Sequence, residues 1–153
     1  MYSVGTSLSV FDTIHGKIGI SICADNSMNS TVLAEAMARM GCDLIVSPCS
    51  WAVSEEFILN KNIYGESWIK AYEKIVHTYK LPMIGVSNVG KITCGAWEGY
   101  KCIGNSIVVS PDCDVIALPF GEAAECCTVV GIKQYDRKKL GTQLAEAVEN
   151  YRV

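Results

Sequence analysis

The spacing of hydrophobic residues in the first half of the chain alternates between a pattern typical of buried strands and one typical of helices. Three short apolar runs rich in β-branched residues indicate buried strands, at 17–22, 43–47 and 83–87. Between them, 31–40 and 66–80 carry apolar residues at helical spacing, and Gly41 and Pro82 follow as helix stops. The order β-α-β-α-β predicts three parallel strands with helices on one face.

The first predicted helix carries two patterns. Its large apolar side chains share one face, made by Val32, Leu33, Ala36, Met37 and Met40. Glu35 and Arg39 have the i,i+4 spacing of an ion pair on the outside of a helix. The segment 49–65 mixes polar and aromatic residues without a clear period, and it is predicted to be a loop that includes at most a short helix.

The second half of the chain has shorter apolar runs. The tripeptide 88–90 is predicted to turn the chain, and 91–104 to be a loop. Three further strands are predicted, at 105–110, 115–118 and 127–132, and the turn 111–114 joins the first two into a hairpin. We expect them to be antiparallel additions to the same sheet. The charged, weakly amphipathic tail after Asp136 predicts a helix that docks on a partner or on another part of the fold.

Length, composition and charge narrow the class of protein. The chain has 153 residues, of which 50% are hydrophobic and 19% charged, as expected for one soluble globular domain. The net charge of −3, without a long basic run, argues against a nucleic-acid partner. No apolar stretch approaches the ~18 residues that span a bilayer, and the first residues lack the layout of a signal peptide. We therefore expect a cytoplasmic protein that does not bind membranes.

The chain contains eight cysteines but only two histidines. No Cys-x-x-Cys pair is present, so the spacing does not support a zinc or iron–sulfur site, and we expect no metal and no cofactor. Most of these thiols are interpreted as small buried hydrophobic groups that stay reduced in the cytosol. Cys23 differs from the rest by its position.

Cys23 follows directly on the apolar run 17–22 and precedes a segment rich in helix-capping residues. A side chain at this point is presented at the carboxyl end of a strand, where sites of α/β sheets lie. A nearby helix N-terminus favours the thiolate, which is the nucleophilic form of cysteine. The position alone is compatible with a catalytic nucleophile or with one more buried thiol.

Several segments in order resemble the nitrilase, or carbon–nitrogen hydrolase, superfamily. The segment 16–25, GKIGISICAD, is similar to its nucleophile strand, and 33–48 continues with a helix, a Gly-x-Asp turn and a strand that ends in proline. The segment 87–90 resembles an Asn-x-x-Gly turn after the third strand, and 104–112 resembles a late Gly-x-Ser strand and hairpin. The likeness covers nearly the whole chain.

The resemblance implies a fold and a chemistry. The fold would be α/β, half of a nitrilase-like α-β-β-α sandwich with one mixed sheet and helices on one face. The chemistry would be hydrolysis of an amide or nitrile, in which the Cys23 thiolate forms a covalent acyl-enzyme. A glutamate would act as general base, and a lysine and a backbone N–H would stabilise the negative charge. The matching N–H is that of Ala24, and Asp25 and Trp51 would lie in the substrate pocket.

The chain also departs from the superfamily pattern. The glutamate and the lysine of the superfamily precede the cysteine, whereas no glutamate precedes Cys23 here. Lys17 is the lysine ahead of it, and strand geometry puts it roughly 20 Å away. Ser27–Ser30 replaces an aromatic-proline-acid stretch, and Cys113 replaces a hairpin glycine. The chain thus matches the C-terminal half of the superfamily domain, and residues 1–153 are interpreted as one truncated domain.

Other acidic and aromatic residues have two interpretations each. Asp25 is either a site carboxylate or a partner of the helix dipole. Trp51 is either a pocket wall or a core aromatic residue. The candidates for a substitute base are Glu55, Glu56 and Glu66. The alternative interpretation is that they are solvated acids on a surface loop. His77 is interpreted as a surface or packing residue.

Three hypotheses follow. The first is a carbon–nitrogen hydrolase of small-molecule amides or nitriles that is complete only with upstream sequence. The second is a non-catalytic nitrilase-like module that binds partners or small molecules, and the third is a cysteine-rich metal or redox protein. Because half of a sandwich leaves one sheet face uncovered, we expect a homo-oligomer or association with a missing half-domain.

Overall fold

The computed structural model of the chain describes residues 3, 5–54, 56–57, 65–117, 128–136 and 140–151. Its strands form two sheets. The larger, six-stranded sheet consists, in order across it, of β1 (Val10–Thr13), β2 (Gly16–Ile20), β3 (Leu44–Cys49), β5 (Met83–Ser87), β8 (Ile107–Ser110) and β9 (Cys113–Ala117). The smaller sheet consists of β4 (Ala52–Val53), β7 (Lys101–Ile103) and β6 (Val89–Lys91).

The larger sheet is mixed, with parallel strands from the first half of the chain and antiparallel strands added at its edges. Strands β2, β3 and β5 run parallel, with Ile20 opposite Val46 and Val46 opposite Ile84. The pairs β1–β2, β5–β8 and β8–β9 are antiparallel. The predicted mixed sheet, with three parallel strands and an antiparallel hairpin added to them, is confirmed.

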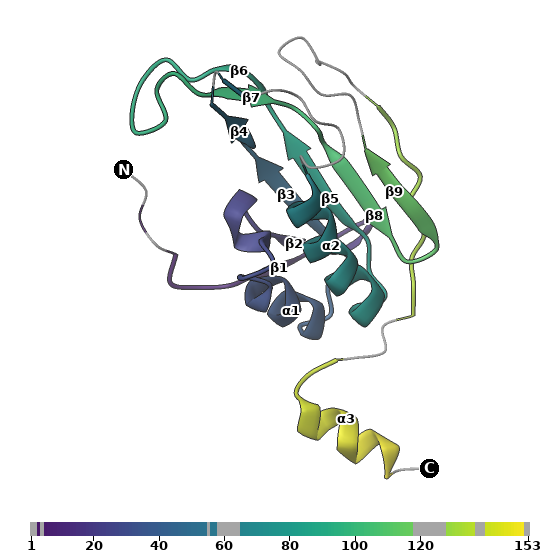
Figure 1. Ribbon diagram of the computed structural model, residues 1–153. Coiled ribbons are helices and arrows are strands. Elements are labelled where there is room, and N and C mark those ends of the chain that lie inside the picture. The colour runs from purple at the N-terminus through teal and green to yellow at the C-terminus, as the bar shows by residue number, and fades with distance from the viewer. Residues whose placement is uncertain are drawn as a thin grey trace.

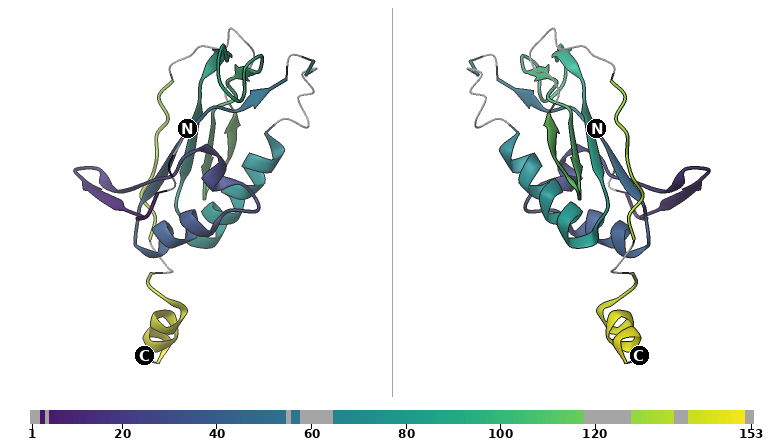
Figure 2. Two further views of the ribbon diagram at one scale, coloured as in Figure 1. Left: turned by 90° about the vertical axis from the view of Figure 1, so that its left-hand side faces the viewer. Right: turned by 90° about the vertical axis from the view of Figure 1, so that its right-hand side faces the viewer.

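Two helices, α1 (Val32–Arg39) and α2 (Glu66–Tyr79), cover one face of the larger sheet (Figure 1). The side views show that the segment 128–136 runs along the opposite face (Figure 2). There the hydroxyl groups of Tyr135 and Ser110 lie 2.9 Å apart. The predicted fold class, an α/β structure with a mixed sheet and helices on one face, is confirmed.

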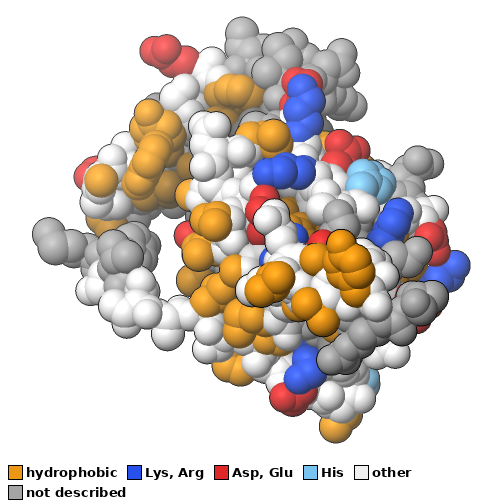
Figure 3. Space-filling model, turned by 90° about the horizontal axis from the view of Figure 1, so that it is seen from below, with side chains coloured by type: hydrophobic (Ala, Val, Ile, Leu, Met, Phe, Trp, Pro, Cys, Tyr) orange, Lys and Arg blue, Asp and Glu red, His pale blue; other side chains and the backbone are white. Residues whose placement is uncertain are grey.

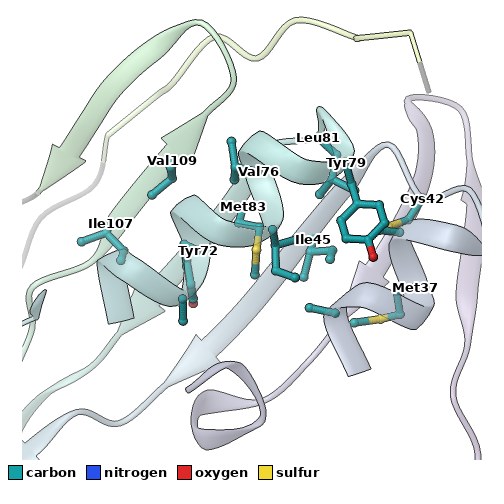
Figure 4. Packing of buried hydrophobic residues seen from close by; sticks show 14 of the residues in the cluster. Met37, Cys42, Ile45, Tyr72, Val76, Tyr79, Leu81, Met83, Ile107 and Val109 are labelled. Atoms are coloured by element: carbon teal, nitrogen blue, oxygen red, sulfur yellow. The ribbon is translucent and has the colours of Figure 1, made fainter. Parts of the chain in front are cut away.

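The hydrophobic core lies between the larger sheet and the two helices (Figure 4). Alternation along β3 and β5 points Ile45 and Met83 into this layer, where they meet Met37 of α1 and Tyr72 of α2. Gly85 of β5 lies beneath Tyr72, and a Cβ at Gly85 would be 2.7 Å from the Tyr72 hydroxyl oxygen. Glycine is needed there because the tyrosine ring occupies the space of a side chain.

The predicted face of the first helix is wrong in part. Val32 is 67% exposed and Met40 is also exposed, whereas Ala34, Met37 and Ala38 are buried. The small side chains of Ala34 and Ala38 let α1 approach its neighbours closely, and Gly19 of the facing strand leaves room for the Met37 sulfur. The helix therefore packs on the face that carries Ala34, Met37 and Ala38, and not on the face that carries its largest apolar side chains.

Glu35 and Arg39 also find partners other than each other. The Glu35 carboxylate accepts hydrogen bonds from Lys74, at 3.0 Å, and from the Thr31 hydroxyl, at 2.8 Å. Arg39 pairs with Glu146 at 2.6 Å and lies over the ring of Tyr79. These contacts join α1 to α2 and to the C-terminal segment, which the i,i+4 spacing did not predict.

Several predictions for the less periodic segments are wrong. The segment 91–104, predicted as a loop, contains β7, which pairs with β6 in a hairpin. Residues 128–132, predicted as part of a strand, have no strand structure, and Cys127 lies outside the described residues. Strand β1 was not predicted, and β3 continues through Pro48 to Cys49. These short strands depend on pairing with a neighbouring strand rather than on local period.

The predicted C-terminal helix is present as α3 (Gln143–Asn150), which projects from the end of the two-layer body where Glu146 pairs with Arg39 (Figures 1 and 2). Leu144, Val148 and Tyr151 are exposed, and hydrophobic side chains gather on the face of the molecule seen from below (Figure 3). In the part of the chain that the structure describes, no helix is both long and apolar enough to cross a bilayer.

Candidate active site

Cys23 begins η1 (Cys23–Asn26), a short 3-10 turn just beyond the carboxyl end of β2. Its backbone has φ = 46°, a left-handed conformation that costs energy for any residue except glycine. Two hydrogen bonds of 2.9 Å hold this turn, from the Ile22 N–H to the Asp25 carboxylate and from the Asp25 N–H to the Ile22 carbonyl. Asp25 therefore braces the turn that presents Cys23.

A buried polar cluster below the turn fixes its position on the sheet. The Asn26 side-chain amide donates hydrogen bonds to the hydroxyls of Ser21, at 2.7 Å, and Ser47, at 3.0 Å. The Ser21 hydroxyl donates back to the Asn26 amide oxygen at 3.0 Å. Because Ser47 belongs to β3 and Ser21 follows β2, these bonds connect the turn to two parallel strands. The cost of burying these polar groups is met by the hydrogen bonds.

The half-buried Cys23 sulfur lies among hydrogen-bond donors. The Cys49 thiol and the backbone N–H groups of Ser50 and Ala24 lower the pKa of Cys23 to about 6, and the Cys49 contact has the largest effect. Partial burial and the negative charge of Asp25 act in the opposite direction. The balance leaves Cys23 as a thiolate at neutral pH, which is the reactive form.

Cys49, the last residue of β3, keeps its proton. It is 7% exposed, its S–H has the Ser47 carbonyl oxygen as an acceptor at 3.3 Å in addition to Cys23, and its sulfur lies 3.4 Å from the Ser47 hydroxyl. The hydrogen bond to Cys23 and burial both raise the pKa of Cys49. The two thiols thus form an unequal pair, in which Cys23 carries the charge and Cys49 donates.

Two aromatic side chains, Tyr72 and Trp51, belong to the same core cluster as Cys49. Burial, together with the neighbouring thiol groups of Cys49 and Cys23, raises the pKa of Tyr72, so its hydroxyl stays protonated. Trp51 is only 3% exposed and stacks on Trp68 with ring centroids 5.4 Å apart. Among the described residues the Trp51 indole nitrogen has no hydrogen-bond partner. Its place in a substrate pocket stays a prediction, since the ring is buried in the core cluster.

The other candidates from the sequence lie in different settings. The Lys17 ammonium group pairs with Asp12 at 2.7 Å, and Glu66 pairs with Lys70 at 2.5 Å. Glu56 and His77 are exposed, and Glu55 lies outside the described residues. Within the described ranges, no group of three His, Cys, Asp or Glu side chains is arranged to hold a metal ion.

Sequence reasoning missed Cys49 and Ser50 as neighbours of Cys23. The available signal was topological. Parallel neighbouring strands place their carboxyl ends at the same edge of a sheet, and both Cys23 and Cys49 come where such strands end. The arrangement holds a thiolate beside backbone N–H groups. A thiolate can attack a carbonyl-type carbon, and backbone N–H groups can stabilise the negative charge that develops on its oxygen.

Comparison with known protein families gives one match that covers most of the chain. The carbon–nitrogen hydrolase family matches residues 1–141. An omega-amidase, NIT2-B of Xenopus laevis, is 48% identical over 46 residues, which are 30% of this chain and 16% of that protein.

Solved structures match the fold of most of the chain. A carbon–nitrogen hydrolase from Helicobacter pylori G27 matches with a TM-score of 0.63 at 22% identity, over 81% of this chain and 42% of that one. Nit3 of Saccharomyces cerevisiae, a member of branch 10 of the nitrilase superfamily, matches with a TM-score of 0.58 at 24% identity, over 78% of this chain and 40% of that one. The chain spans less than half the length of these relatives. It belongs to the carbon–nitrogen hydrolase family.

Proposed function

We propose that this chain carries the nucleophile of a hydrolase for small-molecule amides, and that the nucleophile is the Cys23 thiolate. The observation that carries the proposal is the set of donors on the sulfur, from Cys49, Ser50 and Ala24. A thiolate stabilised in this way is available at neutral pH. The omega-amidase name of a relative that matches part of the chain supports an amide as the substrate.

In the proposed reaction the Cys23 sulfur attacks the amide carbon. The C–N bond then breaks, the amine leaves with a proton delivered by the proposed glutamate, and an acyl thioester remains on Cys23. Water adds to the thioester, releases the carboxylic acid and restores the thiol. Attack removes the negative charge from the sulfur, so the Ala24 N–H is free to donate to the developing oxyanion.

We place the general base and the charge-stabilising lysine on a segment outside these 153 residues, with which the chain would complete one domain. Glu35, Glu66 and Lys17 are engaged in the ion pairs described above. Ile20, Val86 and Ile116 are exposed on strands of the larger sheet. An apolar sheet face of this kind is what the second layer of a sandwich would cover.

The test begins with the coding region immediately upstream. We expect it, or a separate partner gene, to encode a half-domain with the glutamate and the lysine. The two halves are then produced together and assayed for ammonia release from small primary amides, with hydroxylamine present to capture the acyl group. In a parallel reaction without hydroxylamine, proteolytic peptides that contain Cys23 are analysed by mass spectrometry for the acyl thioester.

Two variants make the assay specific. Cys23→Ala is expected to abolish amide hydrolysis and acylation, whereas Cys94→Ser, at an exposed thiol, is expected to leave both unchanged. Activity that survives in Cys23→Ala would refute the assignment of the nucleophile. Binding of amides without any acyl group on Cys23 would favour the non-catalytic module in place of a hydrolase.

A further inference from the structure

The thiol of Cys49 has no role in the proposed hydrolysis beyond its hydrogen bond to Cys23. A serine or a backbone N–H would supply the same donor, but only a second thiol supplies a group that can form a covalent bond to the first. Cys49 is buried at the end of β3, and Cys23 is half-buried on the turn after β2. In the parallel register of β2 and β3, Ile20 lies opposite Val46, so Cys23 and Cys49 each follow the same residue pair by three positions. Cys23 packs against the core cluster that contains Cys49, and the Cys49 thiol is in contact with the Cys23 sulfur.

From this contact we infer that Cys23 and Cys49 form an oxidative modification site, a thiol pair that hydroperoxides convert reversibly into a disulfide. The bond itself does not depend on the hydrolase reaction. Its consequence, reversible loss of the nucleophile, rests on the proposed function. Cys23 would react first, because it is the more exposed thiol and carries the charge, and Cys49 would resolve the product.

The chemistry balances with hydrogen peroxide as the oxidant. The Cys23 thiolate attacks one peroxide oxygen, so that an S–O bond forms, the O–O bond breaks and hydroxide leaves. The sulfur is oxidised to a sulfenic acid and the peroxide is reduced. The Cys49 sulfur then attacks the Cys23 sulfur, an S–S bond forms, and the sulfenic oxygen leaves as water with the Cys49 proton. A dithiol reductant reverses the modification.

A disulfide requires the two sulfur atoms to close to ~2.05 Å. Cys49 is anchored, since it lies opposite Ser87 in the β3–β5 register and its carbonyl accepts a hydrogen bond from the Asn88 N–H. Cys23 sits on a short turn in a strained conformation, outside the strand ladder. The adjustment is therefore expected on the Cys23 side. Contact between the thiols gives the resolving step a high effective concentration.

Cys102 is a second buried thiol whose pKa is raised by burial and by the negative charge of Cys23. It therefore provides the competing pairing for the experiment. Cys94 is exposed and serves as the matched control, because its removal changes the thiol content without touching the pair.

The purified protein is treated with stoichiometric hydrogen peroxide, alkylated and digested with trypsin and chymotrypsin without reduction. Chymotrypsin cleaves after Leu44 and so separates Cys42 from Cys49. We expect a peptide that links Cys23 to Cys49, lighter by two hydrogen atoms than its parts and lost after dithiothreitol. Cys94→Ser is expected to give the same product.

Two variants at position 49 keep the inference open to refutation. In Cys49→Ser and Cys49→Ala, with folding checked by circular dichroism, Cys23 is expected to stop at the sulfenic acid. That acid is captured by dimedone, and without dimedone Cys23 becomes irreversibly oxidised. Dimedone labelling of the parent protein as strong as that of Cys49→Ser would overturn the inference, as would linkage of Cys23 to Cys102. These readouts are independent of hydrolysis, so an inactive hydrolase leaves them interpretable.

Discussion

Replacing Cys49 by alanine is expected to raise the pKa of Cys23. Cys49 is the donor with the largest effect on the Cys23 thiolate, and alanine removes that donor while leaving the Ser50 and Ala24 N–H groups in place. The thiolate loses part of its stabilisation, whereas the burial and the Asp25 charge that oppose it remain. The midpoint of Cys23 ionisation therefore moves upward.

The size of the shift follows from the strength of the lost hydrogen bond. Hydrogen bonds to charged groups contribute about 1.5–3 kcal/mol, and one pKa unit corresponds to about 1.4 kcal/mol. The expected shift is therefore about 1–2 units upward from the pKa of about 6 in the parent protein. Because Cys23 is only half-buried, water replaces part of the lost donor, and the lower end of this range is expected.

The assay is the rate of alkylation by iodoacetamide as a function of pH, with the Cys23-containing peptide quantified by mass spectrometry. The rate rises with pH as the thiolate forms. The midpoint of the profile is the informative quantity, because a thiolate of higher pKa is intrinsically more nucleophilic and its plateau rate increases. Cys49→Ser retains a donor of similar size and is expected to keep the midpoint closer to that of the parent protein.

An unchanged midpoint in Cys49→Ala would refute the reasoning, since the two backbone N–H groups would then suffice to hold the thiolate. An equal upward shift in Cys49→Ser and Cys49→Ala would also contradict it. That result would mean that the hydrogen bond is not the cause of the low pKa. Circular dichroism spectra like that of the parent protein are required of both variants before the profiles are compared.

Three further predictions concern packing and association. Gly85→Ala is expected to destabilise the fold by about 1–3 kcal/mol, because the new Cβ would lie 2.7 Å from the Tyr72 hydroxyl oxygen and 3.1 Å from the Trp51 ring. An unchanged midpoint of urea unfolding would contradict this. Ile45→Ala is expected to cost about 2–5 kcal/mol and the control Ile45→Val about 0.5–1.5 kcal/mol, because Ile45 is fully buried; equal urea midpoints for the two variants would argue against this packing. Light scattering is expected to show that the isolated chain self-associates as its concentration rises, because apolar side chains are exposed on its sheet and on α3; a monomer at every concentration would refute this.

The sequence by itself determined the order of the main elements. The periods of 17–22, 31–40, 43–47, 66–80 and 83–87 predicted three parallel strands and two covering helices, and the structure has them with small changes at the ends. The spacing of apolar residues and the helix stops are enough to predict these elements, because each one buries a face that is visible as a periodic pattern in its own sequence. The place of Cys23 at the carboxyl end of a strand followed from the same pattern.

Only the tertiary structure decided which groups surround Cys23. Two of the donors on its sulfur, Cys49 and Ser50, come from the end of β3 and the residue after it, far away in sequence, and their approach depends on the parallel register of β2 and β3. The packing face of α1 and the β6–β7 hairpin were also decided by the tertiary structure. The side of a helix that packs, and the pairing of a short strand, depend on the element that lies against it as well as on its own sequence. A single sequence locates the thiol, whereas the contacts that lower its pKa exist only once the strands lie side by side.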